Sequence, residues 1–510
     1  MKTILTRFLI AQSFAFLCFT PYAFLYTDGG NRFLFQWRFL DGIEILLASF
    51  MLGSVFFLIY SWSIKQSKRW IQSAVLLGFY LFFAAVGCLT IRLSLVRSHL
   101  ISEVFCQGAW EFLPLILSIP AVLIVYFWRR GLLKKIIRTV CLALSPLPAV
   151  FLVSIWGYSS KFHFTPRPLP SSHSSSASAN DGGTNAYVFI FDEWSYERSF
   201  QDGKLIPAFK RLSAACESMM VFHRAYTPHP ETILSFPSFL FATPDVFRLQ
   251  KDCPGFVCEG KWTPMSEKTS IFRKPKDAGY FTAMIGLYLP YHVFLGKDVH
   301  ACYTHSWSGY KSFSNQFHER MGAHFFKALY CLQLPSLLEY PEWVLRRRNQ
   351  LRFFDQIHSL AMSIIENQSR PTFAVFHYPI PHDPFVFDAD GPRSIFEVRG
   401  KYDVPGYLNN LAFLDRVLGE IIQTLKKAGK FDSSLLIFTT DHSWRWDPKV
   451  KNKKHGCLFI KLPGQERGAI INEPVEIYRF GLLVQRCLSN SPPPDIEKAV
   501  AMLRKGREKN

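Results

Sequence analysis

Five short segments of this chain place acidic, histidine or hydroxyl side chains where an apolar run ends. In chain order they read Phe-Asp-Glu, Thr-Ile-Leu-Ser-Phe-Pro, Pro-His-Asp-Pro, Thr-Asp-His and His-Gly, at residues 191–193, 232–237, 381–384, 440–442 and 455–456. Carboxylate oxygens and imidazole nitrogens are ligands of divalent cations, and a cation bound in this way activates a neighbouring hydroxyl as a nucleophile. The set therefore predicts metal-assisted chemistry on phosphoryl or sulfuryl groups.

The elements that must position these residues follow from the apolar pattern. Continuous apolar runs at residues 186–191, 373–376 and 435–439 are typical of strands buried on both faces. Between the last two runs, residues 407–427 repeat apolar side chains at helical spacing, and Gly429 ends this helix. Strands that alternate with helices predict an α/β domain with a mainly parallel central sheet, whose functional residues gather at the carboxyl ends of the strands.

Two acid-bearing pairs fall at such ends. Asp192 and Glu193 follow the first predicted strand, and Asp441 and His442 follow the last. Acids that terminate buried strands are costly unless a cation or hydrogen bonds compensate their charge. Each pair also has a purely structural interpretation, Asp192 as a helix N-cap and Asp441 with His442 as an exposed turn. Their matching positions favour one shared metal site.

Five apolar segments of membrane-spanning length precede this domain, at about residues 8–26, 42–62, 72–91, 110–128 and 138–156. Lysine and arginine concentrate at the N-terminus, between the second and third segments, and between the fourth and fifth. Because such cations mark cytoplasmic loops, we expect a multi-pass protein of the cytoplasmic (inner) membrane whose C-terminal domain lies outside the cytoplasm. A cleaved signal peptide is the alternative for the first segment, but no small-residue cleavage site accompanies it.

Composition divides the chain into four predicted parts. Residues 1–157 form the membrane domain, 158–185 a flexible linker rich in proline and serine, 186–490 the catalytic domain and 491–510 a basic tail. A net charge of +19 would suggest nucleic acid in a soluble protein, but the cytoplasmic loops explain a fair share of it. The other cations indicate an anionic lipid surface or substrate, or are simply solvated. No nucleic-acid partner is expected.

Taken in order, the motifs resemble those of the alkaline phosphatase and sulfatase superfamily. Asp192-Glu193 resembles its opening acidic pair, Thr440-Asp441-His442 its late Thr/Ser-Asp-His/Asn motif, and the segment 381–384 its Pro-His-x-Pro element. The resemblance extends over residues 186–487 and implies the superfamily's fold. Apolar spans followed by such a domain are similar to phosphoethanolamine transferases and lipoteichoic acid synthases.

The resemblance also implies a nucleophile. Thr232 lies five residues before Pro237, as in the transferase pattern Thr-x-x-Ser-x-Pro, where the threonine is both nucleophile and metal ligand. Ser235 is the reserve nucleophile, because sulfatases place a modified Cys or Ser two residues before the proline. However, Phe239 stands where sulfatases have arginine, which disfavours that modification. Capping of a helix that begins near Pro237 is the structural alternative for Ser235.

The implied site has a metal part and a substrate part. A divalent cation, zinc or manganese, or calcium or magnesium if the site is of the sulfatase type, would be held by five residues: Asp192, Glu193, Thr232, Asp441 and His442. His382 and His455 would bind the substrate phosphate, protonate the leaving oxygen or hold a second metal. His377 and Arg445 are further candidates for substrate contact, with a packed core histidine and a solvated arginine as the alternatives.

The resemblance leaves three functions open. The first is a membrane-anchored phosphotransferase that moves a phospho-alcohol, for example phosphoethanolamine, from a lipid donor to an envelope glycan or lipid. The second is a hydrolase of sulfuric or phosphoric esters with the same metal site. The third is a non-catalytic envelope protein of the same fold, disfavoured because the whole set of reactive residues is present.

Overall fold

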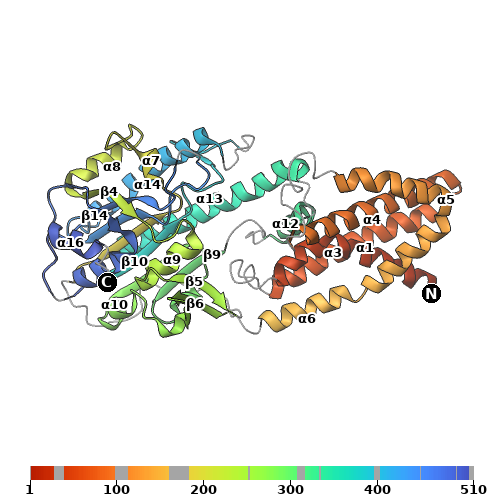
Figure 1. Cartoon of the computed structure of the whole chain (residues 1–510), viewed down its shortest axis with the longest axis horizontal. Helices are drawn as coiled ribbons and strands as arrows, with labels where there is room; N and C mark the ends of the chain where they lie inside the picture. Colours follow the sequence, from red (N-terminus) through yellow and green to blue (C-terminus); the bar gives the residue numbers. More distant parts are fainter. Residues whose placement is uncertain are drawn as a thin grey trace. The chain divides into compact units, whose positions relative to one another are not determined.

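The computed structural model describes residues 2–27, 39–97, 113–159, 183–250, 253–306, 316–331, 335–394, 402–447, 450–489 and 491–504. The chain forms two compact units. One, the helical unit, comprises Met1–His163 and Ser308–Leu345, and the other, the α/β unit, comprises Phe164–Trp307 and Arg346–Asn510 (Figure 1). Most of the predicted linker 158–185 and the end of the predicted tail, 505–510, lie outside the described residues.

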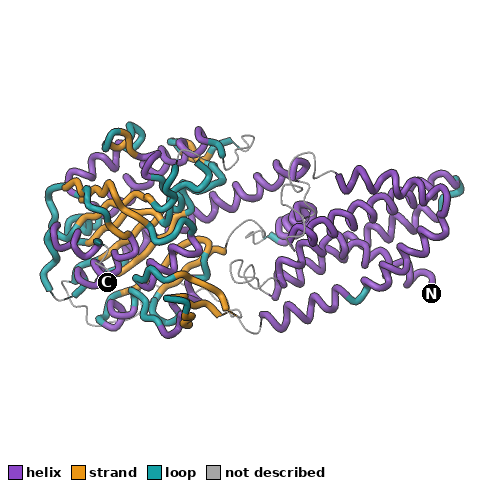
Figure 2. The backbone as a smooth tube through the Cα atoms, viewed as in Figure 1, coloured by secondary structure: helices purple, strands orange, loops and turns teal. Residues whose placement is uncertain are grey.

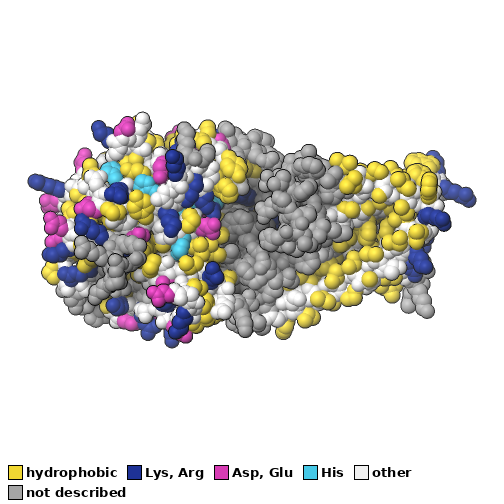
Figure 3. All heavy atoms as spheres, in the orientation of Figure 1, with side chains coloured by type: hydrophobic (Ala, Val, Ile, Leu, Met, Phe, Trp, Pro, Cys, Tyr) yellow, Lys and Arg dark blue, Asp and Glu magenta, His cyan; other side chains and the backbone are white. Residues whose placement is uncertain are grey.

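The helical unit is a bundle of apolar helices. Its helices are α1 (Lys2–Thr27), α3 (Phe39–Ile64), α4 (Arg69–Arg97), α5 (Leu113–Leu144), α6 (Leu147–Ser159) and α12 (Phe317–Cys331). Helix α1 packs against α3, α4, α5, α6 and α12. Large hydrophobic side chains such as Leu58, Phe127 and Trp128 are exposed, and Figure 3 shows hydrophobic side chains along the sides of this unit. Such a surface is suited to lipid rather than water.

Three candidate membrane spans, rather than the predicted five, have the necessary length and hydropathy among the described residues. They are Phe39–Ile64, Arg69–Cys88 and Gly131–Gly157. The first predicted span is represented by a shorter apolar segment, Ile4–Thr20, and the fourth by Ile116–Arg129. Helix α5 loses its helical backbone at Arg129 (φ −141°, ψ 45°), so its two apolar halves do not form one continuous span.

Helix α12 was not expected in this unit, because its sequence lies within the predicted catalytic domain. Buried polar contacts hold it against α1 and α3. Glu44 of α3 accepts a hydrogen bond from Arg320 Nε at 2.8 Å and lies 3.2 Å from His324 Nε2, while the Tyr22 hydroxyl of α1 lies 3.0 Å from His324 Nδ1. The structure thus groups residues 308–345 with the helical unit, and the predicted domain limits did not anticipate this.

The α/β unit is built on a nine-stranded sheet (Figure 2). Its order is β15-β4-β14-β13-β1-β10-β8-β9, with β16 beside β4. The strands are β1 (Ala186–Phe191), β4 (Met220–Tyr226), β8 (Phe281–Tyr288), β9 (Ala301–Ser306), β10 (Thr372–Tyr378), β13 (Leu435–Thr440), β14 (His455–Lys461), β15 (Ala469–Ile471) and β16 (Val475–Glu476). Strands β13, β1, β10, β8 and β9 run parallel, and β14 is antiparallel to both neighbours. The prediction of an α/β domain with a mainly parallel sheet is confirmed.

Strands β1, β10 and β13 are buried at every position, as their continuous apolar sequences predict. Helix α14 (Val404–Lys427) connects β10 to β13 and ends just before Gly429, whose φ of +66° suits glycine. A three-stranded sheet of β5 (Val246–Gln250), β6 (Cys253–Cys258) and β7 (Lys261–Pro264) lies apart from the main sheet.

The predicted basic tail contains a structured element. Helix α16 (Ile496–Leu503) packs against α15 (Phe480–Cys487) and buries Ala499, Val500 and Leu503. Asp495 caps it, because its side chain accepts a hydrogen bond from the backbone N–H of Lys498 at 2.9 Å. The α/β unit therefore extends beyond residue 490.

Candidate metal centre and nucleophile

The carboxyl ends of β1 and β13 bring the two predicted acid-bearing pairs together. Phe191, the last residue of β1, is in register with Thr440, the last residue of β13. The next residues therefore emerge side by side from the same edge of the sheet. Asp192 is only 5% exposed, and Asp441 and His442 are fully buried.

Asp192, Asp441 and His442 form a group whose ligand atoms all lie within 4.8 Å of one another. Among the described residues, Asp192 Oδ1 and Asp441 Oδ2 are buried without a hydrogen-bond partner, and so is Glu193 Oε2. Buried carboxylate oxygens without partners are strongly unfavourable. The residues therefore fit a divalent cation, which would give these oxygens a partner.

The charges in this group support the same conclusion. Burial, together with the neighbouring Asp441, raises the pKa of Asp192 well above its usual value. Burial also opposes ionisation of Asp441, but His442 and His377 outweigh it and lower the pKa of Asp441. Asp441 therefore favours its charged form, and Asp192 favours its protonated form. A cation between them would stabilise both as anions.

Glu193 has an unusual backbone conformation, with a φ of +64°. Its N–H donates to Asp441 Oδ1 at 3.1 Å, and its carbonyl accepts from the Tyr407 hydroxyl at 2.7 Å. A non-glycine residue at positive φ is strained and needs such support, and strain of this kind concentrates at functional sites. The side chain accepts a hydrogen bond from Arg445 Nε at 2.8 Å. Glu193 falls in a second, adjoining group with His382 and Asp383.

Thr232 lies at the cluster, as predicted. It is the first residue of helix α9 (Thr232–Phe241), and its hydroxyl is 3.2 Å from His442 Nε2. His442 Nδ1 lies 2.8 Å from the Ser443 carbonyl. Because a carbonyl only accepts, Nδ1 carries a proton, and Nε2 is the ring nitrogen that faces the Thr232 hydroxyl. The positive end of α9 adds a field that stabilises negative charge on the Thr232 oxygen.

Ser235 is turned away from this cluster. Its hydroxyl donates to the His229 carbonyl at 2.6 Å, and the residue is fully buried. The expectation that it caps a helix beginning near Pro237 is wrong, because α9 begins five residues earlier, at Thr232. The hydroxyl of the reserve nucleophile is therefore already engaged.

His382 and Arg445 form a cationic pair beside Glu193. Burial opposes the charged form of His382, but Glu193, Asp192 and Asp383 outweigh it and raise its pKa to about 9. His382 Nδ1 donates to the Asp383 carbonyl at 2.5 Å. Nε2 lies 3.3 Å from Arg445 Nη2, from which it accepts a hydrogen bond once it has given up its own proton. The predicted substrate-contacting residues His382 and Arg445 thus present two positive charges to the site.

His377, another predicted substrate contact, is fully buried at the end of β10. Its Nδ1 lies 3.0 Å from the Leu287 carbonyl and 2.6 Å from the Tyr291 hydroxyl, and its ring packs 4.3 Å from that of Phe236. Burial lowers its pKa to about 4, so it is neutral. This geometry matches the alternative interpretation, a packed core histidine, because no side of the ring reaches solvent.

His455 belongs to neither of the two groups of candidate ligands in the described part of the chain. Its Nε2 donates to the His223 carbonyl at 2.9 Å, and its Nδ1 lies 3.1 Å from Glu197 Oε1. The ring also packs 4.2 Å from that of Tyr196. The predicted role of His455 at phosphate or metal would require it to give up these contacts.

Three residues support the site without having been predicted to do so. Arg346 forms an ion pair with Asp383, and Tyr407 hydrogen-bonds to the backbone of Glu193 and Ser195. Asp383 stood within a recognised motif, but no motif contained Arg346, and Tyr407 was only the first residue of the predicted helix 407–427. Their supporting role becomes visible only in the folded structure, where each contacts a residue that is distant in the sequence.

A family model described as sulfatase matches residues 185–463, which is more than half of the chain. The chain therefore belongs to the sulfatase family. It is an enzyme of the larger superfamily that also contains the alkaline phosphatases, so the non-catalytic alternative is set aside. No curated protein matches the sequence.

Several solved structures are similar to the α/β unit. The lipoteichoic acid synthase LtaP from Listeria monocytogenes is 15% identical, with 63% of this chain and 78% of that chain covered and a TM-score of 0.38. The PsFucS1 sulfatase from Pseudoalteromonas sp. is 14% identical, with 63% and 72% covered and a TM-score of 0.41. The phosphonate monoester hydrolase of Agrobacterium radiobacter is 14% identical, with 60% and 73% covered and a TM-score of 0.36.

Proposed function

We propose that this enzyme transfers a phospho-alcohol, such as phosphoethanolamine, from a membrane lipid to an envelope glycan or lipid through a phosphothreonine intermediate. The observation that supports this most directly is the contrast between two hydroxyls. Thr232 faces His442 at 3.2 Å, whereas Ser235, at the position of the sulfatase nucleophile, donates to the His229 carbonyl. The helical unit, with its candidate membrane spans, favours a lipid as the donor.

The metal would be held by Asp192, Asp441 and His442, with Glu193 and Thr232 adjoining them. When bound, a divalent cation lowers the pKa of a hydroxyl and neutralises the charge of a phosphoryl group. One imidazole among several oxygens suits zinc or manganese. Calcium or magnesium would suit a site of the sulfatase type.

The protein residues carry the remaining steps. Thr232 gives its hydroxyl proton to solvent, and Oγ1 attacks phosphorus. A P–O bond to threonine forms, and the bond to the lipid alcohol breaks. His382, protonated through its raised pKa, gives the proton on Nε2 to the departing lipid oxygen. Arg445 binds the non-bridging oxygens of the phosphoryl group. In the second half of the cycle an acceptor hydroxyl gives its proton to His382 and attacks phosphorus, and the bond to Thr232 Oγ1 breaks.

A hydrolase of phosphate or sulfate esters is the second candidate, favoured by the family model that the chain matches. Such an enzyme would use the same residues, with water in place of the acceptor hydroxyl. The two activities differ in their acceptor and in their dependence on lipid. We further propose that the α/β unit lies outside the cytoplasm, because the cations of the predicted loops mark the opposite side.

The test is to trap the intermediate. The full-length enzyme in detergent, loaded with zinc or manganese, is mixed with a phosphatidylethanolamine donor, quenched and digested for mass spectrometry. We expect a phosphoethanolamine adduct on Thr232 and release of diacylglycerol. Thr232→Ala should lose both, with a rate loss of several orders of magnitude, and Ser235→Ala should retain the adduct. An adduct or a formylglycine at residue 235 would instead support the sulfatase-type hydrolase.

A further inference from the structure

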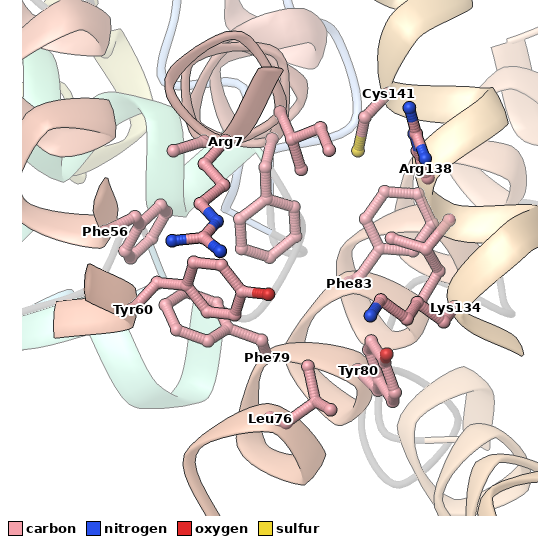
Figure 4. A pocket seen from close by; sticks show the side chains of 14 residues that line it. Arg7, Phe56, Tyr60, Leu76, Phe79, Tyr80, Phe83, Lys134, Arg138 and Cys141 are labelled. Atoms are coloured by element: carbon pink, nitrogen blue, oxygen red, sulfur yellow. The ribbon is translucent and has the colours of Figure 1, made fainter. Parts of the chain in front are cut away.

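The helical unit contains a pocket that the proposed reaction does not use (Figure 4). Its volume is about 120 Å³, and it lies between α1, α3, α4 and the second half of α5. The lining is largely aromatic and includes Phe14, Phe56, Tyr60, Phe79 and Phe83. An aromatic and aliphatic cavity among candidate membrane spans suits a hydrocarbon chain.

Three cations line the same pocket. Arg7 comes from α1, and Lys134 and Arg138 come from consecutive turns of α5. None of the lining residues is Asp or Glu. In Figure 4 the Arg7 guanidinium lies beside Phe56 and Tyr60, and the Lys134 ammonium points toward the same space from the opposite wall. Like charges gathered around one apolar cavity repel one another, so an anion between them would be stabilised.

The position of the pocket in the bundle is also informative. Arg7 is near the start of α1, Tyr60 is near the end of α3, and Lys134 is in the part of α5 that precedes α6. The pocket therefore lies near the end of the helical unit opposite Ser159, where α6 ends. Figure 3 shows Lys and Arg side chains gathered at one end of this unit, beyond its hydrophobic sides. Such a site lies where phospholipid head groups meet acyl chains.

We propose that this pocket binds one anionic glycerophospholipid, with the phosphate between Arg7, Lys134 and Arg138 and the start of an acyl chain among the aromatic rings. A zwitterionic lipid would bring its own cation next to the three cations of the pocket, and a soluble anion would leave the apolar cavity unfilled. The site is distinct from the metal centre, which lies in the other unit, and the proposal does not depend on the reaction catalysed there.

The test measures retained lipid on the intact full-length protein by native mass spectrometry. The protein is titrated with phosphatidylglycerol and, separately, with phosphatidylcholine. A triple variant, Arg7→Gln, Lys134→Gln and Arg138→Gln, removes the pocket cations. The control triple variant, Lys65→Gln, Lys68→Gln and Arg69→Gln, removes the same charge from the loop after α3 and the first residue of α4. None of these three residues lines the pocket.

We expect the wild-type protein to retain phosphatidylglycerol in preference to phosphatidylcholine. Each cation near an anionic head group contributes about a fivefold gain in binding, so the pocket variant should bind phosphatidylglycerol on the order of a hundredfold more weakly. The loop variant should bind nearly as the wild type does. Equal loss in the two variants would show general charge attraction and overturn the proposal, as would unchanged binding in the pocket variant.

A competition experiment separates a lipid from a free anion. Inorganic phosphate and glycerol phosphate carry the same charged group without acyl chains. We expect neither to displace bound phosphatidylglycerol at concentrations where the lipid itself exchanges. Displacement by either one would show that the aromatic cavity contributes nothing and that the site binds soluble anions.

Discussion

At the residue scale, the site brings three carboxylates close to two cationic side chains. Asp192 and Asp441 share a buried space with His442, and Glu193 turns toward Arg445 and His382. The two halves of the site differ in charge. The half around Asp192 and Asp441 has more negative than positive charge, whereas in the half around Glu193 two cationic side chains face one carboxylate. This asymmetry suits a site in which the first half holds a metal and the second half holds the oxygens of an anionic substrate.

A first prediction concerns metal content. Asp441→Asn keeps an oxygen that can accept from the N–H groups of Glu193 and His442, but it removes the charge that a cation requires. We expect this variant, and Asp192→Asn, to lose metal affinity by about tenfold or more, since even residues that only orient metal ligands are worth that much. Metal analysis of the purified protein after dialysis checks the outcome.

Asp383→Asn is the matched control for that experiment. Asp383 lies in the adjoining group, where it pairs with Arg346. We expect its substitution to leave the metal content close to that of the wild-type protein. If it removed the metal while Asp441→Asn did not, the ion would belong to the Glu193 group instead.

A second prediction concerns the protonation of His382. Without a bound cation, its pKa is raised to about 9 by Glu193, Asp192 and Asp383 against the effect of burial. His382 is therefore charged below about pH 9 and loses its proton as the pH rises through that value. A divalent cation on the neighbouring carboxylates repels the imidazolium, so metal loading should lower this pKa and release protons just below that pH.

NMR titration of labelled histidine in the metal-free and metal-loaded enzyme measures this change. His377→Gln serves to identify the signal of one other buried histidine, which lies close to the site. A pKa of His382 that did not move on metal loading would mean that the metal binds elsewhere.

At the scale of elements, the close approach of β14 to β13 determines where the acid-bearing turns lie. A Cβ atom on Gly456 of β14 would overlap the methyl group of Thr440, the last residue of β13. The Thr440 hydroxyl donates to the His442 carbonyl at 2.6 Å and accepts from the Trp194 N–H at 3.0 Å. Thr440 therefore ties the turn after β13 to the turn after β1.

This contact gives a third prediction. Gly456→Ala should displace Thr440, destabilise the α/β unit by about 1–3 kcal/mol as overpacking does, and weaken metal binding. Thermal unfolding and metal titration measure the two effects. The double variant Gly456→Ala with Thr440→Ser removes the obstructing methyl and keeps the hydroxyl, so it should recover most of both losses. If Thr440→Ser did not restore stability and metal binding, the effect of Gly456→Ala would come from the backbone of β14 rather than from this contact.

At the scale of the whole molecule, a helical unit with candidate membrane spans accompanies an enzyme of the sulfatase family on one chain. Helix α12 belongs to the helical unit although it follows β9 in the sequence. The chain therefore contributes to the helical unit twice, once before and once within the α/β sequence. Because α12 makes buried contacts with α1 and α3, a truncated protein that begins after residue 157 would leave α12 without these partners.

A fourth prediction concerns orientation. We proposed that the α/β unit lies outside the cytoplasm, because the cations between the predicted spans mark the opposite side. A reporter enzyme that works only after export, fused behind residue 510, should be active in whole cells. A second fusion in the loop at 65–69 should be inactive, because that loop is expected in the cytoplasm. If the loop fusion were active and the C-terminal fusion inactive, the orientation would be the opposite of the one proposed.

Much of the α/β unit could be predicted from the sequence. The strands β1, β10 and β13 and helix α14 appear where the apolar patterns predicted them, because periodicity and the Gly429 stop are local signals. The number of candidate membrane spans differs from the hydropathy-based prediction, because the apolar segments Ile4–Thr20 and Ile116–Arg129 are shorter than the other three among the described residues.

By itself the sequence determined which acids stand at strand ends, and thus that Asp192, Asp441 and His442 would meet, because strand direction follows from the parallel α/β pattern. Only the tertiary structure decided how the hydroxyls and histidines are used. The start of α9 turns Thr232 toward His442 and Ser235 toward His229, Arg445 is drawn to Glu193, and His455 is held by Glu197. These outcomes depend on contacts between residues far apart in the chain, and such contacts exist only once the sheet has assembled.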